Sequence, residues 1–431
     1  MTNLRSACLV LVSLMLRSTA MPADADGQTT ASAPDAALAH ARALLRSTPL
    51  IDGHNDLPWE IRRAKDHPFD VAAYDLRQPT PKHTDLARLE TGQVGAQFWS
   101  IYVDGEMKDS GYARVQLEEF DIARRMIARY PDRLAPAFTA DDIERAFKRH
   151  RVGSLLGMEG GHAIENSLGV LRSYYALGAR YMTLTHNVTL DWADAALDSA
   201  RHGGLTEFGK EVVREMNRLG MLVDLSHVSP GTMSDALDVT ESPVIFSHSS
   251  ARALVDHPRN VPDSILARLP KNGGLVMVTF VPSFVSDEFK QWEASGDSTL
   301  KQLHAKPDSA EARREWEDWK AAHPAPAATL AQVADHIEHI RQVAGVDHVG
   351  IGSDFDGVDY TPVGLEDVSK FPELFAELIR RGWSDVDLKK LAGQNLLRAL
   401  RQAEATAARL QREREPSTKT IAQLDGGKTT S

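Results

Sequence analysis

The sequence predicts an α/β protein built as a (β/α)8 barrel, and two observations lead to that prediction. Eight apolar runs of strand length alternate with segments of helical periodicity, which is the pattern of a parallel sheet covered by helices. Six of these runs end in a His, Asp or Glu residue. Because functional residues in such barrels gather where the strands end, the recurrence also predicts one shared site at the carboxyl ends of the strands.

The eight predicted strands are short and bounded by polar or small residues. They lie at 49–56, 94–103, 152–159, 180–186, 221–227, 244–248, 274–281 and 348–354. Helical periodicity is clearest at 206–219 and 330–343, where apolar residues recur every three or four positions. A polar segment of helical composition at about 287–326 is predicted to be an inserted subdomain or lid, and 384–405 an amphipathic helix pair.

The two ends of the chain are predicted to lie outside the barrel domain, which covers 48–410. Residues 1–25 have a basic residue at Arg5, then the apolar run 7–16, then small residues, which is the pattern of a signal peptide cleaved on export. An uncleaved anchor is the alternative, although the run is short for a membrane span. Residues 26–47 are predicted to be a linker and a leading helix, and 411–431 a disordered tail.

Composition excludes several classes of function. The 431 residues are 42% hydrophobic and 25% charged, as in a soluble globular protein with a large core. A net charge of −11 without a basic stripe argues against nucleic-acid binding. Cys8, the only cysteine, lies in the predicted signal peptide. The mature chain would then have no disulfide and no cysteine nucleophile, which suits an exported protein, periplasmic or secreted.

The strand ends supply ligands for two divalent metal ions. His54 and Asp56 are two residues apart on a strand, so they point the same way and can share one ion. We assign His227 and His248, at the ends of two later strands, to a second ion. Glu159 would bridge the two, because a carboxylate offers two oxygens. Zinc accepts both nitrogen and oxygen donors, so two Zn²⁺ per chain are the expected cofactors.

Such a site predicts hydrolysis by a hydroxide that bridges the metals. Asp354, at the end of the last strand, is predicted to be the acid/base group, and Asp356 is the alternative for that role. His186 also ends a strand and is predicted to belong to the site, with a structural network through Asn187 as the alternative.

Three further charged or ligand-type residues are weighed against this site. Arg252 follows the strand that ends in His248 and is either an anion clamp or part of a surface salt bridge. His336 and His339 lie three residues apart on a predicted helix, but no carboxylate converges with them. Both are therefore predicted to be surface residues.

Six motifs together resemble one known family. They are IDGHNDLP, GMEGG, LTHN, DLSH, FSHSSARALVDHPRNVPD and GIGSDFDG, in this order between residues 48 and 400. The set is similar to the renal, or membrane, dipeptidase family of zinc peptidases, within the wider amidohydrolase-like barrels. The resemblance implies a binuclear zinc site on the five ligands assigned above. It also implies that His186 contacts the substrate carbonyl, that Arg252 binds the free carboxylate of a dipeptide, and that Asp354 is the acid/base.

The resemblance implies a zinc dipeptidase that acts on free dipeptides, including L-Xaa-D-Xaa substrates, and some family members also hydrolyse β-lactams. A metal-dependent amidohydrolase or lactonase that acts on another small carboxylated substrate is the alternative. A non-catalytic barrel that binds metal or peptide is a further alternative. Asp354 argues against it, because a binding protein does not need a group that transfers protons. The chain lacks cysteines for disulfides and the apolar C-terminal tail of a lipid-anchored form. We therefore expect no stable membrane span after signal cleavage, and a homodimer is kept as a possible assembly.

Overall fold

The computed structural model describes residues 35–107, 111–303 and 310–426, without the side chains at 299–303 and 310–313. The predicted signal peptide and the first part of the predicted linker lie outside the described residues. None of the described helices combines the length and the hydropathy that a bilayer-spanning segment needs.

The predicted barrel is confirmed: eight parallel strands close on themselves, because β9 pairs back to β1. Neighbouring strands follow the order β1, β2, β4, β5, β6, β7, β8, β9, and β3 pairs with β4 only. The strands are β1 (Leu50–Asn55), β2 (Val94–Tyr102), β3 (Leu134–Pro136), β4 (Val152–Glu159), β5 (Ala179–Thr183), β6 (Leu222–Asp224), β7 (Val244–Ser249), β8 (Leu275–Val278) and β9 (Val349–Ile351). The eight predicted strands are all present, and β3 is an addition.

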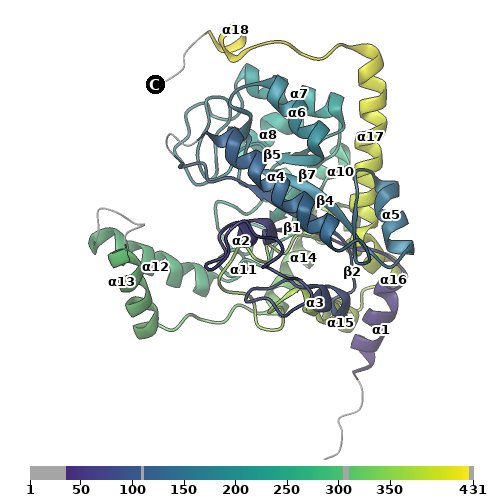
Figure 1. Cartoon of the computed structure of the whole chain (residues 1–431), viewed down its shortest axis with the longest axis vertical. Helices are drawn as coiled ribbons and strands as arrows, with labels where there is room; N and C mark the ends of the chain where they lie inside the picture. The colour runs from purple at the N-terminus through teal and green to yellow at the C-terminus, as the bar shows by residue number, and fades with distance from the viewer. Residues whose placement is uncertain (1–34, 108–110, 304–309, 427–431) are drawn as a thin grey trace, which may run out of the picture. The chain divides into compact units, whose positions relative to one another are not determined.

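Helices connect successive strands and cover the outside of the barrel (Figure 1). They are α1 (Ala36–Leu45), α2 (Leu57–Arg62), α3 (Leu86–Thr91), α4 (Tyr112–Arg129), α5 (Ala140–Lys148), α6 (Leu168–Leu177), α7 (Glu207–Leu219), α8 (Pro230–Val239), α9 (Asp263–Leu266), α10 (Leu269–Asn272), α11 (Pro282–Val285), α12 (Asp287–Leu303), α13 (Ala310–Ala322), α14 (Leu330–Ala344), α15 (Phe371–Arg380), α16 (Asp385–Lys389), α17 (Asn395–Glu413) and α18 (Ile421–Asp425). One turn of π-helix, Lys390–Gln394, joins α16 to α17.

Side chains alternate along each strand between two hydrophobic layers. On β7, Ile245 belongs to a cluster inside the barrel, whereas Val244 and Phe246 belong to the larger cluster between strands and helices. Leu396 and Leu400 of α17 join the inner cluster. Both faces of the sheet are therefore buried, as a parallel sheet requires.

The predicted insertion after the seventh barrel strand consists of α12 and α13, which lie next to each other at one edge of the barrel (Figure 1). Trp292 of α12 packs against Trp316 and Trp319 of α13, with ring centroids 5.9 and 5.2 Å apart. A Cβ atom at Gly296 would lie 2.2 Å from the Trp316 ring. The close contact of the two helices therefore depends on that glycine. Trp292 also contacts Tyr360, in the loop that follows β9.

The C-terminal segment differs from the predicted disordered tail. The chain after α17 returns to α7, where the Asp425 carboxylate accepts a hydrogen bond from Thr206 Oγ1 (2.8 Å) and one from Glu207 N (3.0 Å). Thr420 begins α18 with a capping box. A charged composition predicted disorder, but these end contacts order the chain as far as residue 426. Residues 427–431 lie outside the described part.

Candidate metal centre and active site

The first pair of candidate ligands lies at the end of β1. His54 is fully buried, and its Nε2 lies 3.3 Å from Asp56 Oδ2 and 4.0 Å from Asp354 Oδ1. Its Nδ1 lies 2.9 Å from the Tyr181 hydroxyl, which itself donates to the carbonyl of Gly53. Because the Tyr181 hydroxyl proton is donated to Gly53, the hydroxyl oxygen accepts from His54 Nδ1. The lone pair of Nε2 then points toward the carboxylates.

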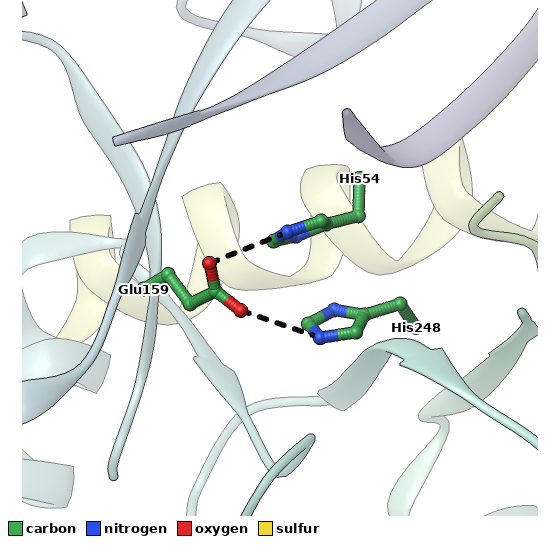
Figure 2. A group of neighbouring side chains, drawn as sticks. All are labelled: His54, Glu159 and His248. Carbon is green, nitrogen blue, oxygen red and sulfur yellow. Dashed lines mark ion pairs between the residues drawn. The ribbon is translucent and has the colours of Figure 1, made fainter. Parts of the chain in front are cut away.

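Glu159, the last residue of β4, lies between the histidines. Its Oε2 is 3.5 Å from His54 Nε2, and its Oε1 is 2.9 Å from His227 Nε2 and 3.5 Å from His248 Nε2. Figure 2 shows one carboxylate oxygen directed at His54 and the other at His248. Ser100 Oγ donates to Oε2 and holds the carboxylate in place. This is the arrangement that a bridging carboxylate requires.

His227 and His248 turn their Nε2 atoms toward each other, 2.8 Å apart. Ser247 Oγ donates to Asp224 (2.5 Å) and lies 2.7 Å from His248 Nδ1, so it accepts the Nδ1 proton. His227 Nδ1 lies 3.0 Å from the side-chain oxygen of Asn187, which can only accept. Both imidazoles therefore keep the Nε2 lone pair for the site.

This donor set fits metal ions. The buried Nε2 of His54 has no hydrogen-bond partner among the described residues. Donor atoms bound tetrahedrally at zinc distances lie roughly 3.3 Å apart, close to the spacings around His54 and Glu159. Three groups have ligand atoms within 4.8 Å of one another: His54, Glu159 and His248; Glu159, His186 and His227; and His54, Asp56 and Asp354.

Burial sets the protonation of these groups. Burial holds the pKa of His227 and of His248 well below its usual range, and nearby positive charge adds to the effect, from Arg259 at His227 and from His54 and Arg259 at His248. Both rings are therefore neutral, as metal ligands must be. Burial also raises the pKa of Asp354 well above its ordinary value, against the opposing attraction of His54. A carboxyl group with a raised pKa binds a proton more readily than an ordinary aspartate does, which is a property that a proton acceptor needs.

The backbone around the site is held in unusual conformations. His227, Asp354 and Asp356 have φ values of 69°, 68° and 67°. A left-handed conformation is uncommon for residues other than glycine, costs on the order of 1–3 kcal/mol, and is concentrated at functional sites. A Cβ atom at Gly357 would lie 2.3 Å from Asp56 Oδ2 and 2.5 Å from Asp354 Oδ1. Only glycine therefore fits beside these two carboxylates.

Asp356 is anchored differently from Asp354. It is fully buried, its Oδ1 accepts from His83 N at 2.8 Å, and its own N–H donates to His83 Nδ1 at 2.9 Å. Asp354 has its carboxylate among the ligand groups instead. The carboxylate of Asp354 therefore faces the ligand groups, whereas that of Asp356 holds the loop.

A cavity of about 330 Å³ opens above the cluster. It is lined by Asp56, Trp59, Arg63, Tyr102, Glu159, His186, Asn187, His227, Arg259, Asp354, Asp356 and Gly357. His186 Nε2 lies 3.9 Å from Glu159 Oε1, and its ring packs edge-on against Tyr102. A larger cavity of about 630 Å³ lies at the first residues of β2 and β4, away from these groups. The smaller one is the candidate active site.

The structure does not bring Arg252 to this cavity. Its guanidinium donates from Nε to His257 O (3.2 Å) and from Nη2 to Pro258 O, so it braces its own loop. Arg259, later in the same loop, lines the cavity instead. It is buried, packs over the ring of Phe284, and donates weakly to a carbonyl of β7. Sequence reasoning missed Arg259.

The prediction that His336 is a surface residue is wrong. Its side chain is 1% exposed on the inner face of α14, and its Nδ1 accepts from Ala251 N at 3.0 Å. The apolar positions around it bury the whole face of the helix. His339, one turn later, pairs with Asp263 and is partly exposed.

Comparison with known proteins identifies the family. The model for membrane dipeptidases, peptidase family M19, matches residues 38–414. The chain belongs to this family. The predicted resemblance is thereby confirmed, and so is the class of enzyme, a metallo-dipeptidase.

Solved structures of similar proteins share the fold. The probable dipeptidase PvdM from Pseudomonas aeruginosa is 24% identical with a TM-score of 0.76, over 87% of this chain and 100% of that one. A metallopeptidase from Rhodobacter sphaeroides, liganded with a phosphinate mimic of the dipeptide L-Ala-D-Ala, is 24% identical with a TM-score of 0.68, over 83% and 99%. A third, dipeptidase AC of family M19, is 25% identical with a TM-score of 0.68, over 83% and 98%.

Proposed function

We propose that this member of the family is a zinc-dependent dipeptidase that hydrolyses free dipeptides, including those with a D-residue at the C-terminus. The observation that carries the proposal is the cluster of four imidazoles and three carboxylates beside one 330 Å³ cavity that is also lined by a buried arginine. The dipeptide mimic in the Rhodobacter sphaeroides structure supports the substrate class.

Two zinc ions suit the donors. His54 and Asp56 would hold one ion, His227 and His248 the other, and Glu159 would bridge them. When bound, the ions would supply Lewis-acid activation of water and of the peptide carbonyl.

The remaining side chains would handle protons and charge. Asp354, 4.0 Å from His54 Nε2 and on the cavity wall, would accept the proton of the attacking water and deliver it to the leaving amine. His186, on the same wall beside Glu159, would hold the substrate carbonyl oxygen and stabilise the negative charge that develops on it.

Arg259 would bind the α-carboxylate of the substrate in place of Arg252. Its buried Nε has no hydrogen-bond partner among the described residues, so a carboxylate would complete its bonding. Burial lowers the pKa of Arg259 to about 10, which leaves it charged at neutral pH. A two-point contact would restrict substrates to those whose C-terminus lies one residue beyond the scissile bond.

Hydrolysis of a small panel tests the proposal. The chain from residue 26 onward is assayed with Gly-D-Ala, L-Ala-D-Ala and N-acetyl-L-Ala-D-Ala, before and after chelation and after zinc is added back. We expect cleavage of the two free dipeptides, its loss on chelation, and its recovery with zinc. The acetylated compound should resist, because it lacks the free amine.

Two results would contradict the proposal in different ways. If two equivalents of zinc bind and no dipeptide is cleaved, the substrate assignment fails. A metal-dependent amidohydrolase or lactonase then becomes the preferred hypothesis for the function. If cleavage survives complete removal of metal, the assignment of the ligands fails.

A further inference from the structure

A second arginine lines the cavity and has no part in the proposed chemistry. Arg63 directly follows α2 and lines the wall together with Asp56 and Trp59. Its side chain is 48% exposed, at the cavity mouth. Arg63 Nε and Nη2 donate to the buried carboxylate of Glu60, and this pair holds the guanidinium in position. Arg63 Nη1 takes no part in the pair.

The two arginines lie at different ends of the cavity. Arg63 caps the end of α2, the helix that Asp56 begins, and its guanidinium bonds to Glu60 of that helix. Arg259 donates to the carbonyl of His248 at the end of β7. Arg63 is therefore held on the helix that follows the ligand pair at β1, and Arg259 is held beside a ligand of the other pair.

Aromatic rings form the wall between Arg63 and the reacting centre. Trp59 packs edge-to-face against Tyr102, with centroids 4.7 Å apart, and Tyr102 packs edge-to-face against His186 at 5.0 Å. Such a wall suits the methylene stem of a side chain whose polar end reaches Arg63. The neighbouring Arg62 does not line the cavity: its guanidinium pairs with Glu118 and Glu119 and lies 5.7 Å from the centroid of the Trp59 ring.

We propose that Arg63, with the wall of Trp59 and Tyr102, forms a subsite for an acidic side chain on the N-terminal residue of the substrate. The inference rests on the proposed function. With the α-carboxylate at Arg259 and the scissile carbonyl beside His186, the N-terminal residue extends toward Trp59 and Arg63. A Glu or Asp side chain there finds a fixed cation at the end of an apolar wall. The preferred substrates are therefore dipeptides that begin with an acidic residue.

The test compares L-Glu-D-Ala with L-Gln-D-Ala, which have the same shape and differ in charge. For the wild-type enzyme with zinc, we expect kcat/KM to favour the glutamyl peptide by about fivefold, the size of effect that a half-exposed ion pair produces. Arg63→Gln should bring the ratio close to one, and Arg63→Glu should invert it. Arg77→Gln removes a similarly exposed cation that pairs with Asp132 and does not line the cavity, so it should keep the wild-type ratio.

L-Ala-D-Glu places the acid on the other residue and should show no dependence on Arg63. A wild-type ratio of one, with both peptides cleaved, overturns the subsite and leaves the dipeptidase assignment intact. The subsite is also overturned if Arg63→Gln lowers kcat/KM for L-Ala-D-Glu and not for L-Glu-D-Ala. If neither these peptides nor L-Ala-D-Ala are cleaved, both the subsite and the proposed function fail. If a variant does not fold, the ratio of kcat/KM values for the two peptides in the wild-type enzyme still tests the subsite.

Discussion

The guanidinium of Arg259 is buried beneath the cavity, with an Nε that bonds to no described residue. A substrate carboxylate would meet a charged donor there, and such bonds contribute about 1.5–3 kcal/mol. Arg259→Met should therefore raise KM for L-Ala-D-Ala by about 10- to 100-fold, with a smaller change in kcat. Arg398→Met is the matched control, since Arg398 also donates to backbone carbonyls but lies on α17. A KM that does not change would exclude Arg259 from the carboxylate site.

Asp354 and Asp356 provide a second comparison of single residues. Asp354→Asn keeps the shape of the side chain but cannot take up a proton, so kcat should fall by about 10²- to 10⁴-fold while the zinc content stays the same. Asp356→Asn should cost less activity, because its carboxylate bonds to the backbone of His83. Turnover on L-Ala-D-Ala and metal content per chain are the two measurements. Full activity in the Asp354 variant would move the acid/base role to Asp356.

Individual ligands could be predicted from the sequence wherever strand geometry decides their position. His54 and Asp56 are two apart on a strand, and His248 ends another, so their convergence follows from the barrel alone. The choice between Arg252 and Arg259 depends on how a loop folds back: Arg252 N donates to Val261 O, and that contact closes the loop. No local pattern in the sequence encodes this closure.

Among the helices, α14 contains a buried titratable group whose effect on stability can be measured. Burial lowers the pKa of His336 to about 4, below the ordinary 6.5 of an unfolded chain. Stability is then complete above pH 6.5 and falls as the pH decreases, because the unfolded chain takes up the proton first. By pH 5 the loss is about 2 kcal/mol, at 1.36 kcal/mol for each pH unit.

His336→Gln should remove this loss, since glutamine can still accept the Ala251 N–H without taking up a proton. Urea unfolding of both proteins in chelator, at pH 7 and pH 5, gives the difference in free energy of unfolding. His67→Gln, which removes an exposed histidine, is the control. The same dependence on pH in wild type and His336→Gln would contradict the prediction.

Elements with strong periodicity were predictable, and those that depend on tertiary contacts were not. The segments 206–219 and 330–343 became α7 and α14 within one residue at each end. The three-residue strand β3, which ends in Pro136, is too short to produce a pattern. The segment after α17 has a polar composition, and its order comes from Asp425 at the start of α7, a contact between residues more than 200 positions apart.

At the scale of the whole molecule, the candidate ligands link strands from all round the barrel. They come from the ends of β1, β4 and β7 and from the residues just after β6. Two ions bound there would act as cross-links of the barrel rim and would bind only the folded chain. Metal binding should therefore raise the stability of the whole barrel, because ligands that bind only the native state stabilise it.

The expected size of this effect follows from mass action. At free zinc about 1,000 times the dissociation constant, each site adds about 4 kcal/mol. At about 1 °C in Tm for each kcal/mol in a chain of this size, thermal unfolding should shift upward by roughly 4 °C per site. The measurement is Tm in chelator and across a zinc titration. His248→Asn removes one ligand and should show a smaller shift in Tm. His150→Asn changes an exposed histidine outside the site and should show the full shift. Equal shifts in both variants would mean that zinc stabilises the protein from somewhere other than this cluster.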